Sequence, residues 1–282
     1  MTTSSQTKLL GIFGNPLAHT LSPKMHSYFA EKTGKDVTYL AFEVEKEDFK
    51  PSVLQAKTMG ALGFNITSPY KIDVLDVVDV LDAEAKRMGS VNTIVNREGK
   101  WCGYNTDGDG FVDSFERILG SFQKKDVLML GAGGSARSIA YKLAQKGAGS
   151  VTISSRTKEK ILPIEDMVKE YTKFYACEEI DTDKQYDIVI NLTPLGMHPH
   201  EEENPFNKYM DMITDKTLCC DLIYNPKKTR FLQEAEAKGA KIMNGLPMLV
   251  MQGIYAFELF CDCKLPEECF NEALALFKDF RI

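Results

Sequence analysis

Short runs of apolar and β-branched residues alternate with amphipathic stretches along most of the chain. This alternation is typical of βαβ units and predicts an α/β fold with mostly parallel sheets. In the first part, the pattern predicts strands over 8–14, 37–44 and 62–66, helices over 22–32 and 49–58, and a longer helix ending near Arg87. Ser22 and Pro23 would be the N-cap and first residue of the helix over 22–32. A hairpin is expected from 91–96 and 101–104.

A second alternating series begins at Asp126. It predicts strands near 126–130, 151–155, 186–191 and 217–222, with helices near 134–146, 158–171 and 227–238. A helix over 108–119, capped by Thr106 or Asp107, precedes this series. The last forty residues predict two more helices, over 247–260 and 266–280. The 282 residues therefore suit two α/β domains better than one.

Composition and charge exclude several classes of protein. A net charge of −6, from 34 basic and 40 acidic residues, argues against a nucleic-acid-binding surface, which usually needs a concentrated basic face. No run approaches 18 consecutive apolar residues, so no membrane association is expected. The first seven residues have no apolar core, and seven cysteines are an odd number. A cytoplasmic protein with reduced thiols is the simplest interpretation.

A metal site is not expected. Cys261, Cys263 and Cys269 lie close together but lack the two paired C-x-x-C spacings of a typical zinc site.

The glycine-rich segment after strand 126–130 predicts dinucleotide binding. It reads G-x-G-x-x-A between a buried strand and a helix, and its residues are Gly131, Ala132, Gly133, Gly134, Ser135 and Ala136. Gly131 permits the tight turn, Gly133 lets a pyrophosphate approach the backbone, and Ala136 lets helix pack on strand. The helix N-terminus then presents N–H groups to the phosphates.

The end of the next strand favours NADP over NAD. NAD-binding domains usually carry an acidic residue there for the ribose hydroxyls, whereas this chain has Ser155, Arg156 and Thr157. Arg156 can pair with a 2′-phosphate or stack on adenine, and Thr157 can donate a hydrogen bond to the phosphate. NAD is the less favoured cofactor.

Polar side chains also follow the strands of the first domain. Loops at the carboxyl ends of parallel strands converge on one crevice, so these side chains can share a pocket: Thr20, Ser22, Asn65, Thr67, Lys71, Asn92 and Asp107. They offer hydroxyls, amides, one ammonium and one carboxylate, which suits a small polyhydroxylated acid. Because no arginine occurs before Arg87, the hydroxyls of Thr20 and Ser22 are the expected carboxylate anchors.

These segments, taken in order, closely resemble the shikimate dehydrogenase family. The resemblance runs through nearly the whole chain, from Gly14-Asn-Pro and Ser22-Pro23 to Asn244-Gly245-Leu-Pro-Met248-Leu-Val-Met-Gln252. It implies reversible, NADPH-dependent reduction of 3-dehydroshikimate to shikimate, a step of aromatic amino-acid biosynthesis. It also implies a substrate domain of 1–106 and 244–282, a Rossmann domain of 107–243, and C-terminal helices that return to the first domain.

The resemblance assigns a role to each matching residue. Lys71 matches the catalytic lysine and Asp107 its aspartate partner. Thr20 and Ser22 match the carboxylate ligands, and the expected ligands of the ring hydroxyls are Asn65, Thr67, Asn92, Tyr224 and Gln252. The nicotinamide would lie against Thr193, Leu222, Gly245 and Met248. The implied state is a monomer or homodimer.

Several positions depart from the family pattern. Thr20 stands where shikimate-preferring members usually have serine, so use of quinate is open. Tyr70 replaces a more usual histidine, Ser155 replaces an asparagine, and Lys160 stands where a second arginine is common, which keeps a positive charge near the cofactor phosphate.

Three alternatives stay open. The first is a quinate/shikimate dehydrogenase of quinate catabolism that uses NAD or NADP. The second is a non-catalytic sensor of ring acids, against which Lys71 and Asp107 argue. The third is another two-domain dehydrogenase, such as one acting on folates, because fold alone does not decide function.

Overall fold

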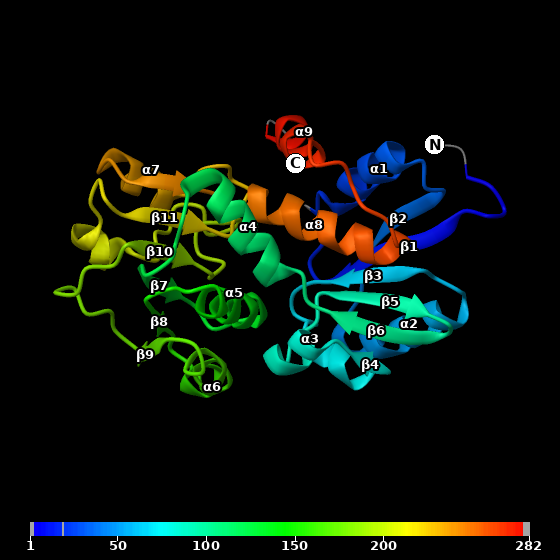
Figure 1. The fold of residues 1–282 in the computed structure, drawn as a ribbon, viewed down its shortest axis with the longest axis horizontal. Helices are drawn as coiled ribbons and strands as arrows, with labels where there is room; N and C mark the ends of the chain where they lie inside the picture. Colours follow the sequence, from blue (N-terminus) through cyan, green and yellow to red (C-terminus); the bar gives the residue numbers. More distant parts are fainter. Residues whose placement is uncertain (1–2, 19, 279–282) are drawn as a thin grey trace. The chain divides into compact units, whose positions relative to one another are not determined.

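The computed structural model describes residues 3–18 and 20–278. The backbone divides into two compact units, Met1–Thr106 with Val250–Ile282, and Asp107–Leu249 (Figure 1). The C-terminal helices therefore belong with the first unit. The second crossing point lies within helix α8, Leu246–Cys261.

The first unit is built on a six-stranded mixed sheet. Its strand order is β2 (Val37–Glu43), β1 (Lys8–Gly14), β3 (Gly63–Ile66), β5 (Thr93–Arg97), β6 (Lys100–Tyr104) and β4 (Val80–Leu81). β1, β2 and β3 are parallel, while β5 runs antiparallel to both of its neighbours. Because β5 is reversed, the residues that precede it lie at the same edge as the residues that follow β1, β3 and β6.

Helices cover both faces of this sheet, and β3 shows how its side chains alternate between them. Phe64 and Ile66 join an aromatic core with Phe49 of α2 (Lys46–Thr58). Gly63 faces the other way, where an added Cβ would come within 2.4 Å of Phe260 in α8. Asn65 shares this second face with Gly63, next to α1 (Ser22–Thr33) and α8. The short α9 (Cys269–Phe277) completes the unit.

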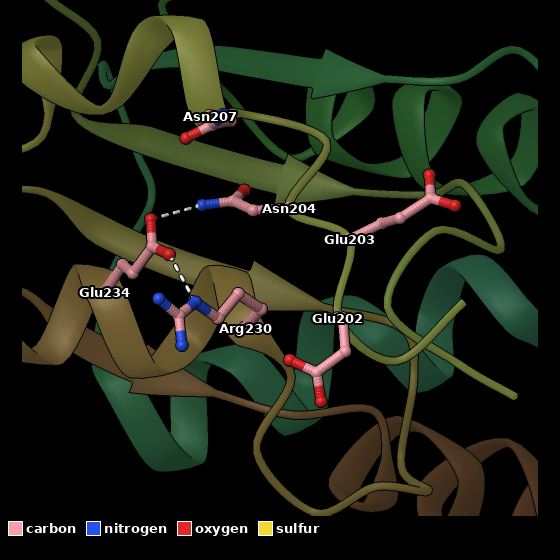
Figure 2. A pocket seen from close by; sticks show the side chains of 6 residues that line it. All are labelled: Glu202, Glu203, Asn204, Asn207, Arg230 and Glu234. Carbon is pink, nitrogen blue, oxygen red and sulfur yellow. Dashed lines mark hydrogen bonds and ion pairs between the residues drawn. The ribbon is translucent and has the colours of Figure 1, made fainter. Parts of the chain in front are cut away.

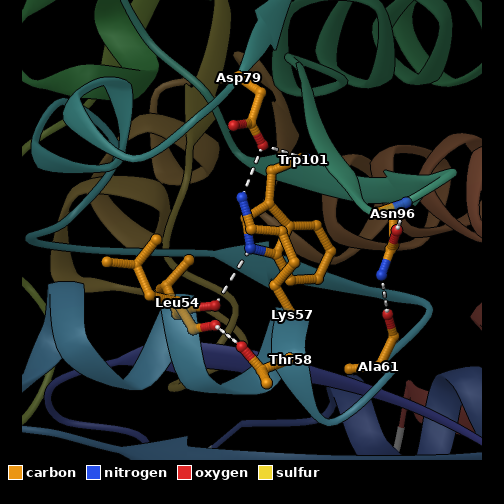
Figure 3. Close-up of polar contacts among 9 residues, drawn as sticks. Leu54, Lys57, Thr58, Ala61, Asp79, Asn96 and Trp101 are labelled. Carbon is orange, nitrogen blue, oxygen red and sulfur yellow. Dashed lines mark hydrogen bonds and ion pairs between the residues drawn. The ribbon is translucent and has the colours of Figure 1, made fainter.

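A buried tryptophan ties the β5–β6 hairpin to α2 (Figure 3). Trp101 is fully buried, and its indole N–H donates to the Val53 carbonyl at 3.1 Å. Its backbone N–H donates to Asp79 at 2.6 Å, and Lys57 pairs with the same carboxylate at 2.8 Å. The Lys57 contact holds the pKa of Asp79 below its usual range. These bonds fix the hairpin, and with it the residues just before β5.

The second unit is a parallel six-stranded sheet with Rossmann order. The order is β12 (Lys241–Met243), β11 (Leu218–Asp221), β10 (Ile188–Asn191), β7 (Asp126–Leu130), β8 (Ser150–Ser154) and β9 (Lys173–Cys177). The chain reverses its direction of winding between β7 and β10, which is where such sheets bind dinucleotides. The helices are α4 (Asp107–Leu119), α5 (Gly134–Gln145), α6 (Leu162–Val168) and α7 (Arg230–Ala237). The predicted α/β class is confirmed, and the second unit has the strand order of a Rossmann domain.

Some expected elements were wrong. The long helix ending near Arg87 is instead a 3₁₀ turn (Asp73–Asp76), the strand β4 and a new helix α3 (Ala83–Met88). Asp82 starts α3 by accepting hydrogen bonds from the N–H groups of Glu84 and Ala85. Leu21, not Ser22, is the N-cap of α1.

In the second unit, the helix expected over 158–171 divides into a 3₁₀ turn (Lys158–Lys160) and α6. Strands β9 and β12 and the 3₁₀ helix Asn207–Met212 were not predicted. None of the described helices is both long and apolar enough to cross a bilayer.

One polar side chain in the first core has no hydrogen-bond partner. His26 of α1 is 1% exposed, and neither ring nitrogen is bonded within the described part of the chain. Its ring stacks on Tyr39 of β2 with centroids 4.1 Å apart, and Phe29, Phe257 and Phe260 also lie against the His26 ring. Burial lowers the pKa of His26 to about 3, so the imidazole is neutral at physiological pH.

His26 should make stability depend on pH. Its folded-state pKa of about 3 lies below the ordinary 6.5. Between these two pH values the unfolded chain therefore binds a proton that the folded chain does not. The free energy of unfolding should therefore rise with pH up to about 6.5, by at most about 1.4 kcal/mol per pH unit from this group. Urea unfolding of the wild type and His26→Phe at several pH values measures the difference. Parallel profiles for the two proteins would contradict the burial of a neutral imidazole.

Candidate functional site

Six of the seven polar residues expected in one pocket lie on or beside strands at one edge of the first sheet. Thr20 and Ser22 follow β1, Thr67 and Lys71 follow β3, and Asn92 directly precedes the reversed β5. The sheet topology alone brings these loops to a common edge, because the ends of β1 and β3 lie beside the start of β5. Tyr224 and Asp107 belong to the second unit.

Asn65 is held by three hydrogen bonds. The Tyr39 hydroxyl donates to its Oδ1 at 2.7 Å. Its Nδ2 donates to the Asn92 carbonyl at 3.2 Å and to the Thr93 hydroxyl at 3.1 Å. Asn65 is 6% exposed, and unsatisfied polar atoms are costly at such a position. The amide therefore has one orientation.

Asn92 links the start of β5 to the end of β6 and to α8. Its Oδ1 accepts from the Thr106 backbone N–H at 2.8 Å and from the Thr93 hydroxyl at 2.9 Å. Its Nδ2 donates to the Thr106 hydroxyl at 2.9 Å and to Gln252 Oε1 at 3.4 Å. The Thr106 hydroxyl also donates to the Gln252 carbonyl at 3.1 Å. Gln252, 160 residues away in sequence, thus lies in the same cluster as Asn92.

The two hydroxyls expected to hold a carboxylate lie together. The Thr20 hydroxyl donates to Ser22 Oγ at 3.2 Å and accepts from the Ser22 N–H at 3.3 Å. A pair of hydroxyls that can reorient is a suitable partner for two carboxylate oxygens.

Tyr70, the departure from the family pattern beside Lys71, has a structural role. Its ring is buried and stacks on Phe49 with centroids 4.2 Å apart, and its hydroxyl donates to the Val44 carbonyl at 2.6 Å. The Thr67 N–H donates to the Phe13 carbonyl at 2.9 Å, and the Lys71 carbonyl accepts from Val91 at 2.9 Å. The backbone that carries Lys71 is therefore fixed on both sides.

The glycine-rich turn of the second unit has the geometry that its sequence requires. Gly131 has a φ of +112°, and an added Cβ would lie 3.2 Å from the Leu192 backbone. Gly133 is the N-cap of α5 and is exposed, and an added Cβ there would meet nothing within 4 Å. Ala136 is buried where α5 packs on the sheet. The open space over Gly133 lets a ligand approach the protein backbone.

The end of β8 presents cationic and hydroxyl groups to solvent. Arg156, Thr157 and Lys160 are exposed, and the Thr157 N–H donates to Ser155 Oγ at 3.2 Å. Glu178, from the end of the neighbouring β9, pairs with Lys158 at 2.9 Å. The donors Arg156, Thr157 and Lys160 fit a phosphate.

Asp107, the first residue of α4, is 4% exposed and accepts a long hydrogen bond of 3.5 Å from Ser135 of the glycine-rich turn.

A buried carboxylate joins three segments of the second unit, and no pattern in the sequence had indicated a role for it. Asp221, at the end of β11, accepts from Asn191 Nδ2 at 3.1 Å, the Ile223 N–H at 3.0 Å and the Thr229 hydroxyl at 2.7 Å. Asn191 Oδ1 in turn accepts from the Thr193 hydroxyl at 2.7 Å. Asp221 therefore fixes the loops that carry Thr193, Leu222 and Tyr224.

The last expected cofactor residues lie close to these loops. Gly245 donates its N–H to the Ile223 carbonyl at 3.0 Å, and an added Cβ would meet the Leu222 carbonyl oxygen at 1.9 Å. Only glycine permits this approach. Met248 follows one turn later in α8 and is buried.

A separate depression of about 520 Å³ contains none of the expected residues. Glu202, Glu203, Asn204, Asn207, Arg230 and Glu234 line it (Figure 2). Glu234 is already bonded to Arg230 at 2.6 Å and to Asn204 at 2.7 Å. It is a polar surface feature and not the expected site.

Two family models match this chain. The shikimate dehydrogenase substrate binding domain matches residues 12–94, and the shikimate / quinate 5-dehydrogenase model matches residues 113–224. Together they cover more than half of the chain.

Individual proteins match over nearly their whole lengths. The shikimate dehydrogenase (NADP(+)) of Bacillus mycoides strain KBAB4 is 39% identical over 260 residues, 91% of this chain and 93% of the relative. A crystal structure of a shikimate dehydrogenase in complex with NADP+ is 34% identical with a TM-score of 0.89, covering 99% of this chain and 98% of that one. The shikimate 5-dehydrogenase of Thermus thermophilus, in complex with NADP(H) and shikimate, is 30% identical with a TM-score of 0.85, covering 96% and 99%.

Removing the Asp221 carboxylate should destabilise the second unit. Asp221→Ala leaves three donors without their acceptor and should lower the free energy of unfolding by about 2–4 kcal/mol, whereas Asp221→Asn keeps part of the network and should cost less. Urea unfolding measures both.

Burial also raises the pKa of Asp221 to about 6 from its ordinary 3.8. Between these two pH values the folded chain therefore binds a proton that the unfolded chain does not. The stability of the wild type relative to Asp221→Asn should fall as pH rises from about 4 to 6. Equal losses for both variants, or a difference between wild type and Asp221→Asn that does not vary with pH, would contradict this description of the site.

Proposed function

The chain belongs to the shikimate dehydrogenase family, and from this membership and its two sets of site residues we propose that it interconverts 3-dehydroshikimate and shikimate with NADP(H). The proposed physiological direction is reduction, toward aromatic amino-acid biosynthesis. The observation that carries the proposal is the amide and hydroxyl cluster of Asn65, Asn92, Thr106 and Gln252. Such groups suit the hydroxyls of a ring acid.

The substrate contacts are assigned from the family resemblance, and the arrangement of the side chains in the first unit supports them. Thr20 and Ser22 are assigned to the carboxylate, because their hydroxyls are adjacent at the sheet edge. Asn65, Thr67, Asn92, Tyr224 and Gln252 are assigned to the ring hydroxyls. Quinate differs from shikimate at the ring carbon that bears the carboxylate, so the extra methyl group of Thr20 makes quinate a substrate to test.

The residues present fit NADP. Space over Gly133 admits a pyrophosphate at the start of α5, within the turn formed by Gly131, Ala132, Gly133, Gly134, Ser135 and Ala136. The half-buried Ser155 and the exposed Arg156, Thr157 and Lys160 are donors that suit a 2′-phosphate better than two ribose hydroxyls. Thr193, Leu222, Gly245 and Met248 are assigned to the nicotinamide. NADPH would supply the hydride.

Lys71 and Asp107 are assigned to proton transfer. When hydride adds to the ketone carbon, the C=O π bond breaks and the oxygen needs a proton. The Lys71 ammonium can stabilise this oxygen and donate the proton, and in the oxidation it takes the proton back. Asp107 is assigned to orient the lysine and the reacting hydroxyl.

A cytoplasmic location and a monomer or homodimer belong to the same proposal. All seven cysteines are unpaired thiols, as expected in a reducing compartment.

Absorbance at 340 nm tests the proposal directly. Shikimate and quinate are each paired with NADP and NAD for the wild type, Lys71→Ala and the exposed-lysine control Lys100→Ala. Shikimate with NADP should give the highest kcat/KM, and Lys71→Ala should lower kcat by about 10²–10⁴-fold while Lys100→Ala leaves it unchanged.

The other outcomes of this assay would each contradict the proposal. Equal or faster turnover of quinate, or turnover with NAD, would replace the proposal with the catabolic alternative. No turnover despite NADP binding would refute the assigned chemistry.

Gly133→Ala tests the cofactor site separately from stability. The new Cβ meets no protein atom within 4 Å, and the backbone angles of Gly133 suit alanine, so the melting temperature should stay the same. NADP affinity, measured by fluorescence titration, should fall by about tenfold or more, because the methyl group occupies the approach to the pyrophosphate. Gly131→Ala, with its positive φ, should instead lose stability. Unchanged NADP affinity in Gly133→Ala would place the pyrophosphate elsewhere.

A further inference from the structure

The hydrogen bonds of Asn65 limit what this residue can offer a ligand. A side-chain amide has two N–H donors and an oxygen with two lone pairs. Both donors of Asn65 are used, by the Asn92 carbonyl and the Thr93 hydroxyl. One lone pair of Oδ1 is used by the Tyr39 hydroxyl at 2.7 Å. What remains is one acceptor position.

The partners of Asn65 prevent the amide from turning over. The Asn92 carbonyl can only accept, so the NH₂ group must face it. The oxygen then faces Tyr39, which must donate. Burial raises the pKa of Tyr39 well above its ordinary value, so its hydroxyl keeps its proton at physiological pH.

Tyr39 reaches Asn65 across the intervening strand β1. In the sheet register Tyr39 pairs with Leu10 and Asn65 pairs with Ile12, so the two side chains lie diagonally on one face. The Tyr39 ring is 4% exposed and stacks on His26 at an interplanar angle of 3°. This packing fixes the direction in which the hydroxyl points.

We propose that Tyr39 is a positioning residue of the substrate site, which acts through Asn65. Its hydroxyl holds the amide so that Asn65 offers the ligand only an acceptor, and the site thereby selects a substrate with a hydroxyl donor at that ring position. The inference rests on the proposed function, because it takes the ligand to be a hydroxylated ring acid.

Tyr39→Phe tests this role because it removes one oxygen and keeps the ring that stacks on His26. KM for shikimate should rise about five- to tenfold, while kcat and KM for NADP change less than about twofold. Tyr28→Phe is the matched control, since it also loses a tyrosine hydroxyl bond of the first unit, to Glu272. It should leave every kinetic constant unchanged.

Substrate analogues distinguish positioning from a structural role. In the wild type, kcat/KM for either 4-deoxyshikimate or 5-deoxyshikimate should be at least about tenfold lower than kcat/KM for shikimate. In Tyr39→Phe, this ratio should be at least about threefold smaller than in the wild type. A purely structural residue would lower the melting temperature without this coupling.

The outcomes separate the inference from the proposed function. If the wild type does not oxidise shikimate, the proposed function fails. If it does, the positioning role is refuted by an unchanged KM for shikimate in Tyr39→Phe, or by a loss of kcat/KM with the deoxy analogue that is equal in both proteins. If Tyr39→Phe does not fold, the wild type alone still tests the proposal, because full activity with both analogues would refute acceptor-only recognition.

Discussion

Buried amides and carboxylates at strand ends must have hydrogen-bond partners, and this requirement shapes both sets of site residues. An unsatisfied buried polar group costs about 1–3 kcal/mol, so each of these side chains holds the segments around it in one arrangement. Asn65 and Asn92 do this in the first unit, and Asn191 and Asp221 do it in the second. The loops between them carry most of the residues assigned to substrate and cofactor.

The two units meet the requirement with different chemistry. The first uses neutral groups, the amides of Asn65 and Asn92 and the phenol of Tyr39, which leave an acceptor position on Asn65 for a hydroxylated ligand. The second uses one carboxylate, Asp221, that accepts from three segments and is ionised above about pH 6. Because their pKa values shift in opposite directions relative to solution, His26 and Asp221 have opposing effects on stability between about pH 4 and 6.

Local patterns predicted much of this structure, and non-local contacts account for most of what was missed. The turn at Gly131 and the strand before it could be predicted because their signals lie within a few residues. Strands β9 and β12 were missed because they lie at the two edges of the sheet and bury only one residue each, so they lack the apolar run of the central strands. Tyr39 and Asn65 are 26 residues apart, and Asn191 and Asp221 are 30 residues apart, and no local spacing indicates such pairs.

A crystal structure of the protein with NADP+ and shikimate tests the central claim most directly. We expect the shikimate carboxylate on the hydroxyls of Thr20 and Ser22, a ring hydroxyl donating to Asn65 Oδ1, and the oxidised carbon beside the nicotinamide with Lys71 at its oxygen. Shikimate bound away from these side chains, or an Asn65 amide turned to donate to the ligand, would contradict the claim that the buried polar networks define the site.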